Sequence, residues 1–354
     1  MLQYVHGGDI QTYIDRHGFA PLDLSANINP FGIPDAVRAA MHRAVDNCTQ
    51  YPDPFCRAAR QAIGAREGVN PDFLYCGNGA ADVLDRLAAV LKPRKVLLTA
   101  PTFAEYERTL SGAEIRVHNL RETDGFALTE RILDEISPDL DAVYLCNPNN
   151  PTSSCITQKD MRRILDACKE CDIYVMVDET YVEFATNMAE IDSVPLTNYY
   201  NNIVILRGTS KFFAAPGLRL GYAITGNRDL IREINTRKNP WTINSLAVVA
   251  GETMFTDTDY IHATKELITA ERNRMFQALK NSLDFKVYNP SGNFILARIL
   301  RDDLTSQDLF DRAIRQKMMI RDCSTFPFLD NKYIRFCIMN PEDNDRLLKC
   351  LLGK

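Results

Sequence analysis

The sequence lacks long apolar runs and blocks of like charge, and it contains a single tryptophan. Its apolar runs have the length of a β-strand, as at residues 142–145 and 173–177, whereas a transmembrane helix needs about 20 apolar residues. The 41 basic and 46 acidic residues nearly balance, with a net charge of −5. We therefore expect neither a membrane partner nor a nucleic-acid partner.

The cysteines and histidines form no disulfide framework and no zinc-binding pattern. Ten cysteines are scattered over 354 residues, the five histidines are dispersed, and the CxxC from Cys168 to Cys171 has no second pair. We predict reduced thiols, two of them on a helix surface at the CxxC, and no metal site. The first residues lack the basic flank and apolar core of a signal peptide, so we expect a cytoplasmic protein.

Apolar segments alternate with amphipathic helical segments between about residues 55 and 240, which is typical of a mostly parallel sheet with helices on both faces. The expected strands are residues 73–76, 95–99, 114–118, 142–146, 173–177, 203–206 and 221–224. Beyond them we expect a long helix (245–282), a helix (306–317) and strands at 285–288, 294–298, 319–321 and 333–338. The sequence thus predicts an α/β fold in three parts: an N-terminal arm with part of the small domain (1–40), a large domain (41–240) and a small α+β domain (241–354).

Polar motifs follow the strands of the predicted parallel sheet, where ligands collect at the carboxyl ends. They are residues 77–82, 147–152, 178–181 and 209–211. The first is a Gly-rich strand-to-helix turn, whose free backbone N–H groups suit a phosphate, although most such turns only reverse the chain.

The most informative segment is the one around Lys211. This lysine follows Ser210, precedes Arg219 by eight residues, and is followed by the apolar residues 212–216, which would lower its pKa by desolvation. A lysine amine, a hydroxyl with a guanidinium, and a carboxylate at a strand end, here Asp178, are the groups that pyridoxal 5'-phosphate (PLP) requires. Lys211 is predicted to form the Schiff base, Ser210 and Arg219 to hold the phosphate, and Asp178 to keep the ring nitrogen protonated.

Two neighbours, Tyr181 and Phe103, complete the predicted cofactor site. Tyr181 lies three residues beyond Asp178 and is placed to reach the phenolic oxygen of PLP, whereas Glu179 should point to the opposite face of the strand. Phe103 is predicted to stack on the ring, although an aromatic residue just past a strand is more often part of the core. Without a cofactor, an aspartate at the position of Asp178 would be a helix N-cap or a turn residue.

Arg321 and Arg335 each lie in an apolar strand-like segment of the small domain. Isolated arginines at such places usually make modest surface salt bridges. If the two converge on a pocket that already holds a phosphate cofactor, they indicate a substrate with two acidic groups, because a guanidinium binds carboxylate or phosphate in bidentate fashion.

These residues resemble the fold-type I PLP-dependent enzymes of aminotransferase class I/II over essentially the whole chain. The matching segments are residues 51–53, 77–79, 147–152, 178–181, 210–211 and 219–221. The resemblance implies a seven-stranded type of mostly parallel sheet between helices. It also implies that Asn150 and Tyr181 bind the cofactor's O3', and that Asn78, Gly79 and Ala80 join Ser210 and Arg219 at its phosphate.

The resemblance also implies a homodimer with shared active sites, in which Tyr51 reaches the neighbouring subunit's cofactor. The expected substrate is a small phosphorylated amino acid. The residues implied for binding it are Arg321, Arg335, Asn150, and, near its phosphate, His6 and Asn29.

Within this family the chain most resembles the enzymes that decarboxylate L-threonine O-3-phosphate in cobalamin biosynthesis. The segments that carry this resemblance are residues 6–10, 24–30, 103–106, 120–125, 240–244 and 320–327. The implied reaction yields (R)-1-aminopropan-2-yl phosphate and CO2. L-serine O-phosphate is a further candidate substrate, because one methyl group contributes only about 1–3 kcal/mol of discrimination. Histidinol-phosphate aminotransferases share the general motifs and both arginines, and a PLP-fold protein without catalysis is the third alternative.

The chain departs from the family pattern at two positions. Ser153 follows Thr152 where the family usually has glycine, which would alter that loop without touching Asn150. Gly208 stands where the family often has a second hydroxyl, which Thr209 would have to replace or the cofactor phosphate would lose one hydrogen bond.

Overall fold

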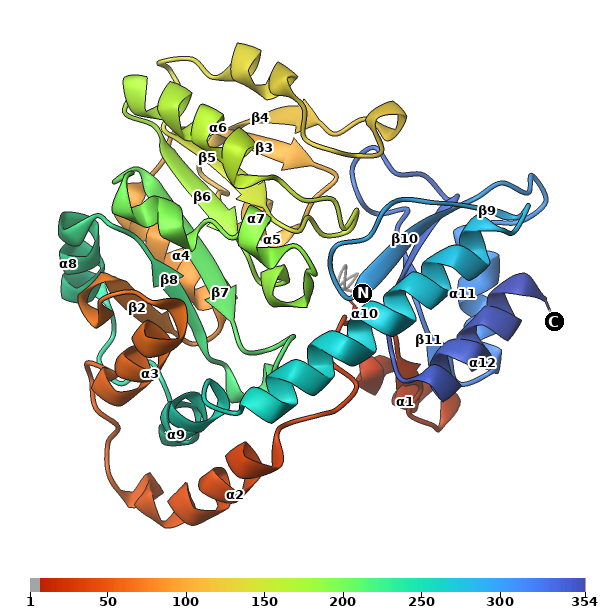
Figure 1. Cartoon of the computed structure of the whole chain (residues 1–354), viewed down its shortest axis with the longest axis horizontal. Helices are drawn as coiled ribbons and strands as arrows, with labels where there is room; N and C mark the ends of the chain where they lie inside the picture. The colour runs from red at the N-terminus through yellow and green to blue at the C-terminus, as the bar shows by residue number, and fades with distance from the viewer. Residues whose placement is uncertain (1–6, 354) are drawn as a thin grey trace.

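A seven-stranded sheet forms the centre of the larger part of the molecule (Figure 1). The computed structural model describes residues 7–353. The strand order is β2-β8-β7-β6-β5-β3-β4, in which β3 to β7 run parallel and β8 runs antiparallel to both of its neighbours. The strands are β2 (Leu74–Gly77), β3 (Lys95–Ala100), β4 (Glu114–Asn119), β5 (Ala142–Cys146), β6 (Tyr174–Asp178), β7 (Ile203–Gly208) and β8 (Gly221–Ile224). The mostly parallel α/β sheet predicted from the sequence is therefore confirmed.

Both faces of this sheet are covered by helices, which explains why its strands are apolar at consecutive positions. In β5, Val143 and Leu145 belong to the cluster that includes α3 (Arg57–Glu67) and α6 (Gln158–Glu170). The alternate residues Ala142, Tyr144 and Cys146 belong to the cluster that includes α4 (Ala80–Leu91) and α8 (Arg228–Arg237). Successive side chains of a strand point to opposite faces, so every strand except the edge strand β4 contributes to two cores.

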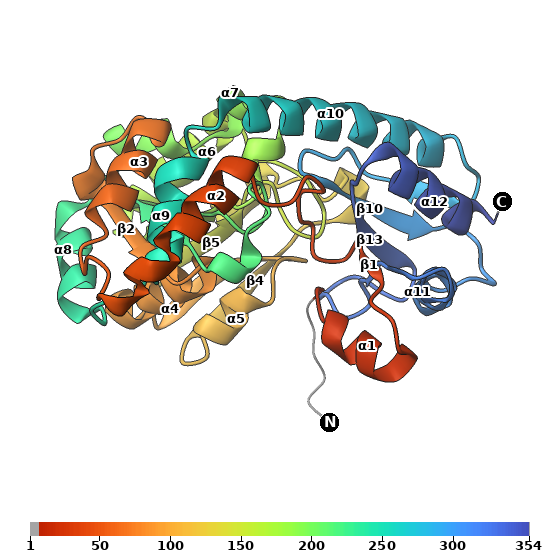
Figure 2. The same ribbon diagram turned by 90° about the horizontal axis from the view of Figure 1, so that it is seen from below.

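The small domain contains a four-stranded antiparallel sheet with the order β12-β13-β10-β9. Its strands are β9 (Phe285–Val287), β10 (Phe294–Ile299), β12 (Arg321–Asp322) and β13 (Tyr333–Cys337), and its helices are α11 (Ser306–Arg315) and α12 (Pro341–Leu352). The 23-residue helix α10 (Thr258–Lys280) runs along both parts of the molecule (Figures 1 and 2).

The N-terminal segment contributes to both parts. Strand β1 (Leu22–Asp23) pairs in parallel with β11 (Met318–Met319), and α1 (Ile10–His17) lies beside the small domain (Figure 2). Helix α2 (Asp35–Ala44) crosses over to pack against α9 (Ser245–Met254) and lies near α3. The boundary predicted at residue 240 would assign α9 to the small domain, whereas α9 packs against α2 and α3 on the side of the large sheet.

Three local predictions are wrong. The helix expected over residues 245–282 is two helices, α9 and α10, because the side chain of Asp257 caps the second by accepting a hydrogen bond from the Tyr260 N–H. The strand expected over 319–321 is divided between β11 and β12, which belong to different sheets. Cys168 is not a surface thiol: it is buried in the core under α6, and burial raises its pKa to about 12.

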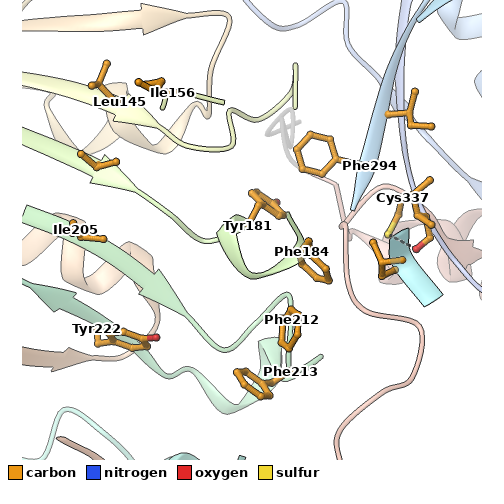
Figure 3. Packing of buried hydrophobic residues seen from close by; sticks show 14 of the residues in the cluster. Leu145, Ile156, Tyr181, Phe184, Ile205, Phe212, Phe213, Tyr222, Phe294 and Cys337 are labelled. Atoms are coloured by element: carbon orange, nitrogen blue, oxygen red, sulfur yellow. Dashed lines mark hydrogen bonds between the residues drawn. The ribbon is translucent and has the colours of Figure 1, made fainter. Parts of the chain in front are cut away.

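The hydrophobic core is continuous between the two parts. Figure 3 shows Tyr181, Phe184 and Phe212 at the ends of the large-sheet strands, facing Phe294 and Cys337 of the small-domain sheet. The rings of Tyr181 and Phe294 are 4.9 Å apart in an edge-to-face arrangement. Within residues 7–353, no helix is both long and apolar enough to cross a lipid bilayer.

Candidate active site

A cavity of about 740 Å³ lies between the carboxyl ends of the large-sheet strands and the small domain. This is the position that an open α/β sheet favours for a ligand. Ten of the predicted residues line it, namely Ala80, Phe103, Asn150, Asp178, Tyr181, Ser210, Lys211, Arg219, Arg321 and Arg335. The residues predicted from separate motifs therefore converge on one space.

Lys211 lies in the turn that follows β7, and its amine points toward the N-terminal segment. Nζ donates a hydrogen bond to the backbone oxygen of Ala26 at 2.7 Å. Desolvation, with a further contribution from the nearby guanidinium of Arg335, lowers the pKa of Lys211 to about 8. An amine with this pKa is neutral in an appreciable fraction of molecules at physiological pH, which nucleophilic addition to a carbonyl requires.

Asp178 ends strand β6 and presents a carboxylate whose orientation is fixed on both oxygens. Oδ2 accepts from the Tyr106 hydroxyl at 2.8 Å, and Oδ1 accepts from the Thr180 hydroxyl at 2.5 Å and the Thr180 N–H at 2.9 Å. The next residue, Glu179, points away from the cavity and binds Arg207 at 2.7 Å. The alternation expected along the strand therefore separates the two carboxylates as predicted. Tyr106 carries no predicted role, although it lies in the noted segment 103–106.

The N-terminus of α4 and Arg219 form a narrow cradle. Gly79 is the N-cap residue, with φ at +85°, and because it has no side chain it does not cap the N–H groups that follow. Nη2 of Arg219 donates to the Asn78 carbonyl at 3.2 Å. A Cβ on Gly79 would lie 2.2 Å from that Nη2, and one on Gly221 would lie 2.4 Å from the Ala80 nitrogen. Glycine at both positions lets the guanidinium and the N–H groups lie close enough together for one anion.

Thr209 does not replace the hydroxyl that is missing at Gly208. It is fully buried, and its hydroxyl donates to the Leu220 carbonyl at 3.2 Å. Ser210 is the hydroxyl of this turn that lines the cavity.

Arg335 and Arg321 lie directly opposite each other in the β12–β13 register, on the small-domain side of the cavity. The Arg335 guanidinium is buried and donates to Asn150 Oδ1 and to the Ser25 carbonyl. Its Nε has no hydrogen-bond partner among the described residues. Nη2 of Arg321 donates to the Thr325 hydroxyl at 2.8 Å, and burial lowers the pKa of Arg321.

The N-terminal segment contributes through residues that the sequence prediction missed. Ser25 and Ala26 line the cavity and accept from Arg335 and Lys211 through their carbonyls. Nδ2 of Asn27 donates to the Tyr181 hydroxyl at 3.4 Å. Residues 24–30 were noted for their resemblance, but backbone acceptors leave no signature in side-chain identity.

Two predicted residues, Asn29 and Tyr51, lie elsewhere. Asn29 does not line the cavity: Nδ2 lies within 2.9 Å of three acceptors on Phe212, Tyr260 and Thr264, so its amide has no hydrogen left for a substrate. Tyr51 is 79% exposed and stacks on Trp241, away from the cavity of its own chain. His6 lies outside the described residues.

The residues of the cavity fit PLP. The Lys211 amine, the oriented Asp178 carboxylate, the anion cradle at α4 and the Phe103 ring match the aldehyde, the ring nitrogen, the phosphate and the π face of that molecule. Within residues 7–353, no three His, Cys, Asp or Glu side chains are grouped so that they could hold a metal ion.

Comparison with known proteins points to the same chemistry. The family Aminotransferase class I and II matches residues 20–351. The threonine-phosphate decarboxylase of Salmonella typhimurium is 37% identical over 98% of this chain and 95% of its own length. The solved histidinol-phosphate aminotransferase of Clostridium acetobutylicum is 30% identical, with a TM-score of 0.87 over 94% of this chain and 98% of that one.

A third relative shows the same fold with its cofactor in place. The histidinol-phosphate aminotransferase of Sinorhizobium meliloti, solved in complex with PLP, is 20% identical with a TM-score of 0.85 over 98% of this chain and 94% of that one. The chain therefore belongs to the aminotransferase class I and II family of enzymes, with the fold-type I architecture, and its cofactor is pyridoxal 5'-phosphate.

Proposed function

We propose that this enzyme decarboxylates L-threonine O-3-phosphate to (R)-1-aminopropan-2-yl phosphate and CO2, for the aminopropanol linker of cobalamin. The observation that carries the proposal is the pair of guanidiniums, Arg335 and Arg321, that face the Lys211 side of one cavity. A substrate that bears both a carboxylate and a phosphate can bind both guanidiniums, one with each acidic group. The 37% identity to a threonine-phosphate decarboxylase supports the same reaction.

When bound, PLP supplies a carbonyl that joins the substrate amine and a π system that accepts the electrons of a broken Cα bond. The chain's own residues then select the bond. In decarboxylation the Cα–carboxylate bond breaks, its electron pair is delocalised into that π system as CO2 leaves, and a proton from Lys211 Nζ then takes the place of CO2 at Cα. In transamination Lys211 Nζ removes the Cα proton instead. The contacts of Arg335 with Asn150 and Ser25 fix the guanidinium that would orient the substrate.

The proposal gives the residues of the site the following roles. Lys211 is the catalytic amine, Asp178 the partner of the ring nitrogen, and Tyr181 with Asn150 the partners of O3'. The phosphate of PLP is held by Ser210, Arg219 and the Ala80 N–H, because the N–H groups of Asn78 and Gly79 already donate to Asp82 Oδ2 at 2.9 Å and to the Gly77 carbonyl at 2.8 Å. In a homodimer, Tyr51 would reach the partner's cofactor, and its 79% exposure leaves its ring available for that contact.

The second candidate is histidinol-phosphate aminotransferase activity, which is supported by the 30% identity to such an enzyme over 94% of this chain. Histidinol phosphate has no carboxylate. In that reaction one of the two arginines would therefore bind only the acidic co-substrate, such as 2-oxoglutarate. A single assay separates the candidates. The PLP-loaded enzyme is incubated with threonine phosphate, with serine phosphate, or with histidinol phosphate plus 2-oxoglutarate, and CO2 and glutamate are measured.

We expect CO2 with threonine phosphate and, more slowly, with serine phosphate, because one methyl group changes selectivity by about 1–3 kcal/mol. Glutamate without CO2 would contradict the proposal and support the aminotransferase. Bound PLP without either product would support a binding protein. Lys211→Ala should abolish the adduct that borohydride reduction traps between protein and PLP, whereas Lys92→Ala, at an exposed helix end, should leave it intact.

A further inference from the structure

Ser153 lies at the turn that carries Asn150 and has a backbone conformation that disfavours serine. Its φ is +61°, in the left-handed region, where the backbone of a residue other than glycine is strained. The residue is fully buried. The turn is closed by Ser153 N–H donating to the Asn149 carbonyl at 2.6 Å and by Asn149 N–H donating to the Ser154 carbonyl at 2.8 Å.

The Ser153 hydroxyl binds the small domain. Oγ accepts from the N–H of Ser291 at 3.1 Å and from the N–H of Gly292 at 2.8 Å. The Ser153 carbonyl also accepts from the Ser291 N–H at 3.0 Å. A Cβ on Gly292 would lie 3.3 Å from this Oγ and 3.0 Å from the Phe294 ring, so glycine there allows the hydroxyl to approach both N–H groups.

The carbonyl side of the dipeptide Ser291–Gly292 is also held in place. The carbonyls of Ser291 and Gly292 accept from Arg272 Nη1 at 2.8 and 2.9 Å. That buried nitrogen also donates to the Phe184 carbonyl of the large domain at 2.9 Å. Both peptide groups of residues 291–292 are thus held between a large-domain turn and helix α10.

This dipeptide leads directly into β10, the neighbour of the strand that carries Arg335. In the register of β10 and β13, Phe294 faces Cys337 and Leu296 faces Arg335. The Arg335 guanidinium in turn donates to Asn150, three residues before Ser153. Asn150 and Ser153 therefore contact the small domain at two points of one turn, and the Ser153 contact fixes the strand that positions Arg335.

We propose that Ser153 is a positioning residue, which holds β10 and β13 against the 149–154 turn so that Arg335 keeps its position relative to Asn150 and Lys211. The inference rests on the proposed function only in naming threonine phosphate as the substrate that Arg335 orients. Its structural part, the Ser153 contact with residues 291–292, holds for any substrate of this cavity.

The test uses the PLP-loaded enzyme, the apo-enzyme and three variants. Ser153→Gly suits the positive φ and removes the hydroxyl, Ser153→Ala removes the hydroxyl and keeps the strain, and Ser154→Ala is the matched control. The Ser154 hydroxyl binds Thr152 and the Phe126 carbonyl, both in the large domain. The Gly variant has no reason to misfold, so it keeps the test valid if the Ala variant is unstable.

Both Ser153 variants should raise the KM for threonine phosphate by about tenfold. A change of this size corresponds to the loss of about one buried hydrogen bond, here the one that supports the position of Arg335. They should also increase the proportion of transamination to decarboxylation, because a displaced Arg335 no longer selects one Cα bond. In the apo-enzyme, amide exchange in peptides that cover residues 288–294 should become faster. Ser154→Ala should change none of the three measurements.

An unchanged KM and product ratio in Ser153→Gly, or an equal change in Ser154→Ala, would overturn the proposal. If the unaltered enzyme releases no CO2, the proposed function fails. The exchange rate of residues 288–294 and the affinity for threonine phosphate, measured by titration of the cofactor absorbance, then still decide the role of Ser153.

Discussion

Lys211 and Arg335 are two basic side chains that face one cavity from different domains. They have no direct hydrogen bond, but the guanidinium acts on the amine through space, because each positive charge disfavours the other. Desolvation and this repulsion both favour the neutral form of Lys211. The arginine that is proposed to bind an acidic substrate group therefore also prepares the amine for its reaction.

This coupling predicts the pH dependence of Lys211 in the apo-enzyme. The amine should be acetylated by a small anhydride with a half-maximal rate near pH 8, since its pKa is lowered from 10.5 to about 8. Below that pH it is protonated and unreactive. Arg335→Gln removes the repulsive charge, so the midpoint should rise by about one pH unit. Mass spectrometry of the digested protein measures the extent of acetylation at each pH.

The other lysine peptides of the same digest are the internal control, and their profiles should not change in Arg335→Gln. An unchanged Lys211 midpoint in this variant would show that desolvation alone sets the pKa.

The sequence predicted the side chains of the site better than its backbone groups. Asp178 and Glu179 were assigned to opposite faces correctly, because strand alternation is a local rule. Asn29 was expected near the substrate, yet its three acceptors come from residues 212, 260 and 264, and no local pattern brings those together. The carbonyls of Ser25 and Ala26 could not be identified because every residue has one.

At the scale of the elements, side chains of the segment after β4 bind the small-domain sheet and so hold the large domain against it. Glu122, in the short helix η3 (Glu122–Asp124), accepts from Lys286 at 2.8 Å, Tyr288 at 2.7 Å and Arg298 at 2.9 Å. Phe126 packs edge-on against Tyr288, with ring centroids 4.8 Å apart. These contacts give the noted segment 120–125 a structural role, which is to fasten the two domains beside the cavity.

The Glu122 contacts predict a specific loss of stability in acid. Burial opposes the shift, but hydrogen bonds from Lys286, Tyr288, Arg298 and Tyr333 together lower the pKa of Glu122 from 4.5 to about 2. The stabilisation is therefore complete above pH 4.5 and is lost as the pH falls toward 2. Glu122→Gln should lower the free energy of unfolding by about 1–2 kcal/mol at pH 7, a value reduced for the solvent that reaches the carboxylate.

Urea denaturation at pH 7 and at pH 3 measures this effect, and the difference between variant and unaltered protein should shrink at the lower pH. Glu130→Gln is the control, because its ion pair with Arg163 is exposed on the surface. A similar loss in both variants would mean that the Glu122 contacts have no special importance.

The elements themselves were largely predictable. All the large-sheet strands except the edge strand β4 are apolar runs bounded by glycine, proline or polar residues, and the limits of all seven are predicted within about two residues. The division between β11 and β12 was not predictable, because the partner of β11 is β1, nearly 300 residues earlier in the chain. Such a pairing depends on long-range contacts that leave no periodicity in the segment itself.

At the scale of the whole molecule, helix α10 and the continuous core join the two domains. Arg272, on α10, is 3% exposed and, among the described residues, has no carboxylate partner. Its charge is met by three backbone carbonyls, one from Phe184 of the large domain and two from the dipeptide before β10. Burial accordingly lowers its pKa to about 10, still high enough to keep it protonated at neutral pH.

We therefore predict that Arg272 makes the two domains unfold together. In the unaltered apo-enzyme, urea transitions followed by Trp241 fluorescence, which reports on the large-domain side, and by far-UV circular dichroism, which reports on both domains, should coincide. Arg272→Leu leaves three buried carbonyls without a donor and should cost about 2–4 kcal/mol. The small domain should then unfold first, so that the circular dichroism transition begins at lower urea than the fluorescence transition.

Lys280→Leu, on the exposed end of the same helix, should keep the two transitions coincident. Coincident transitions in Arg272→Leu, even at a lower midpoint, would show that the continuous core alone couples the domains.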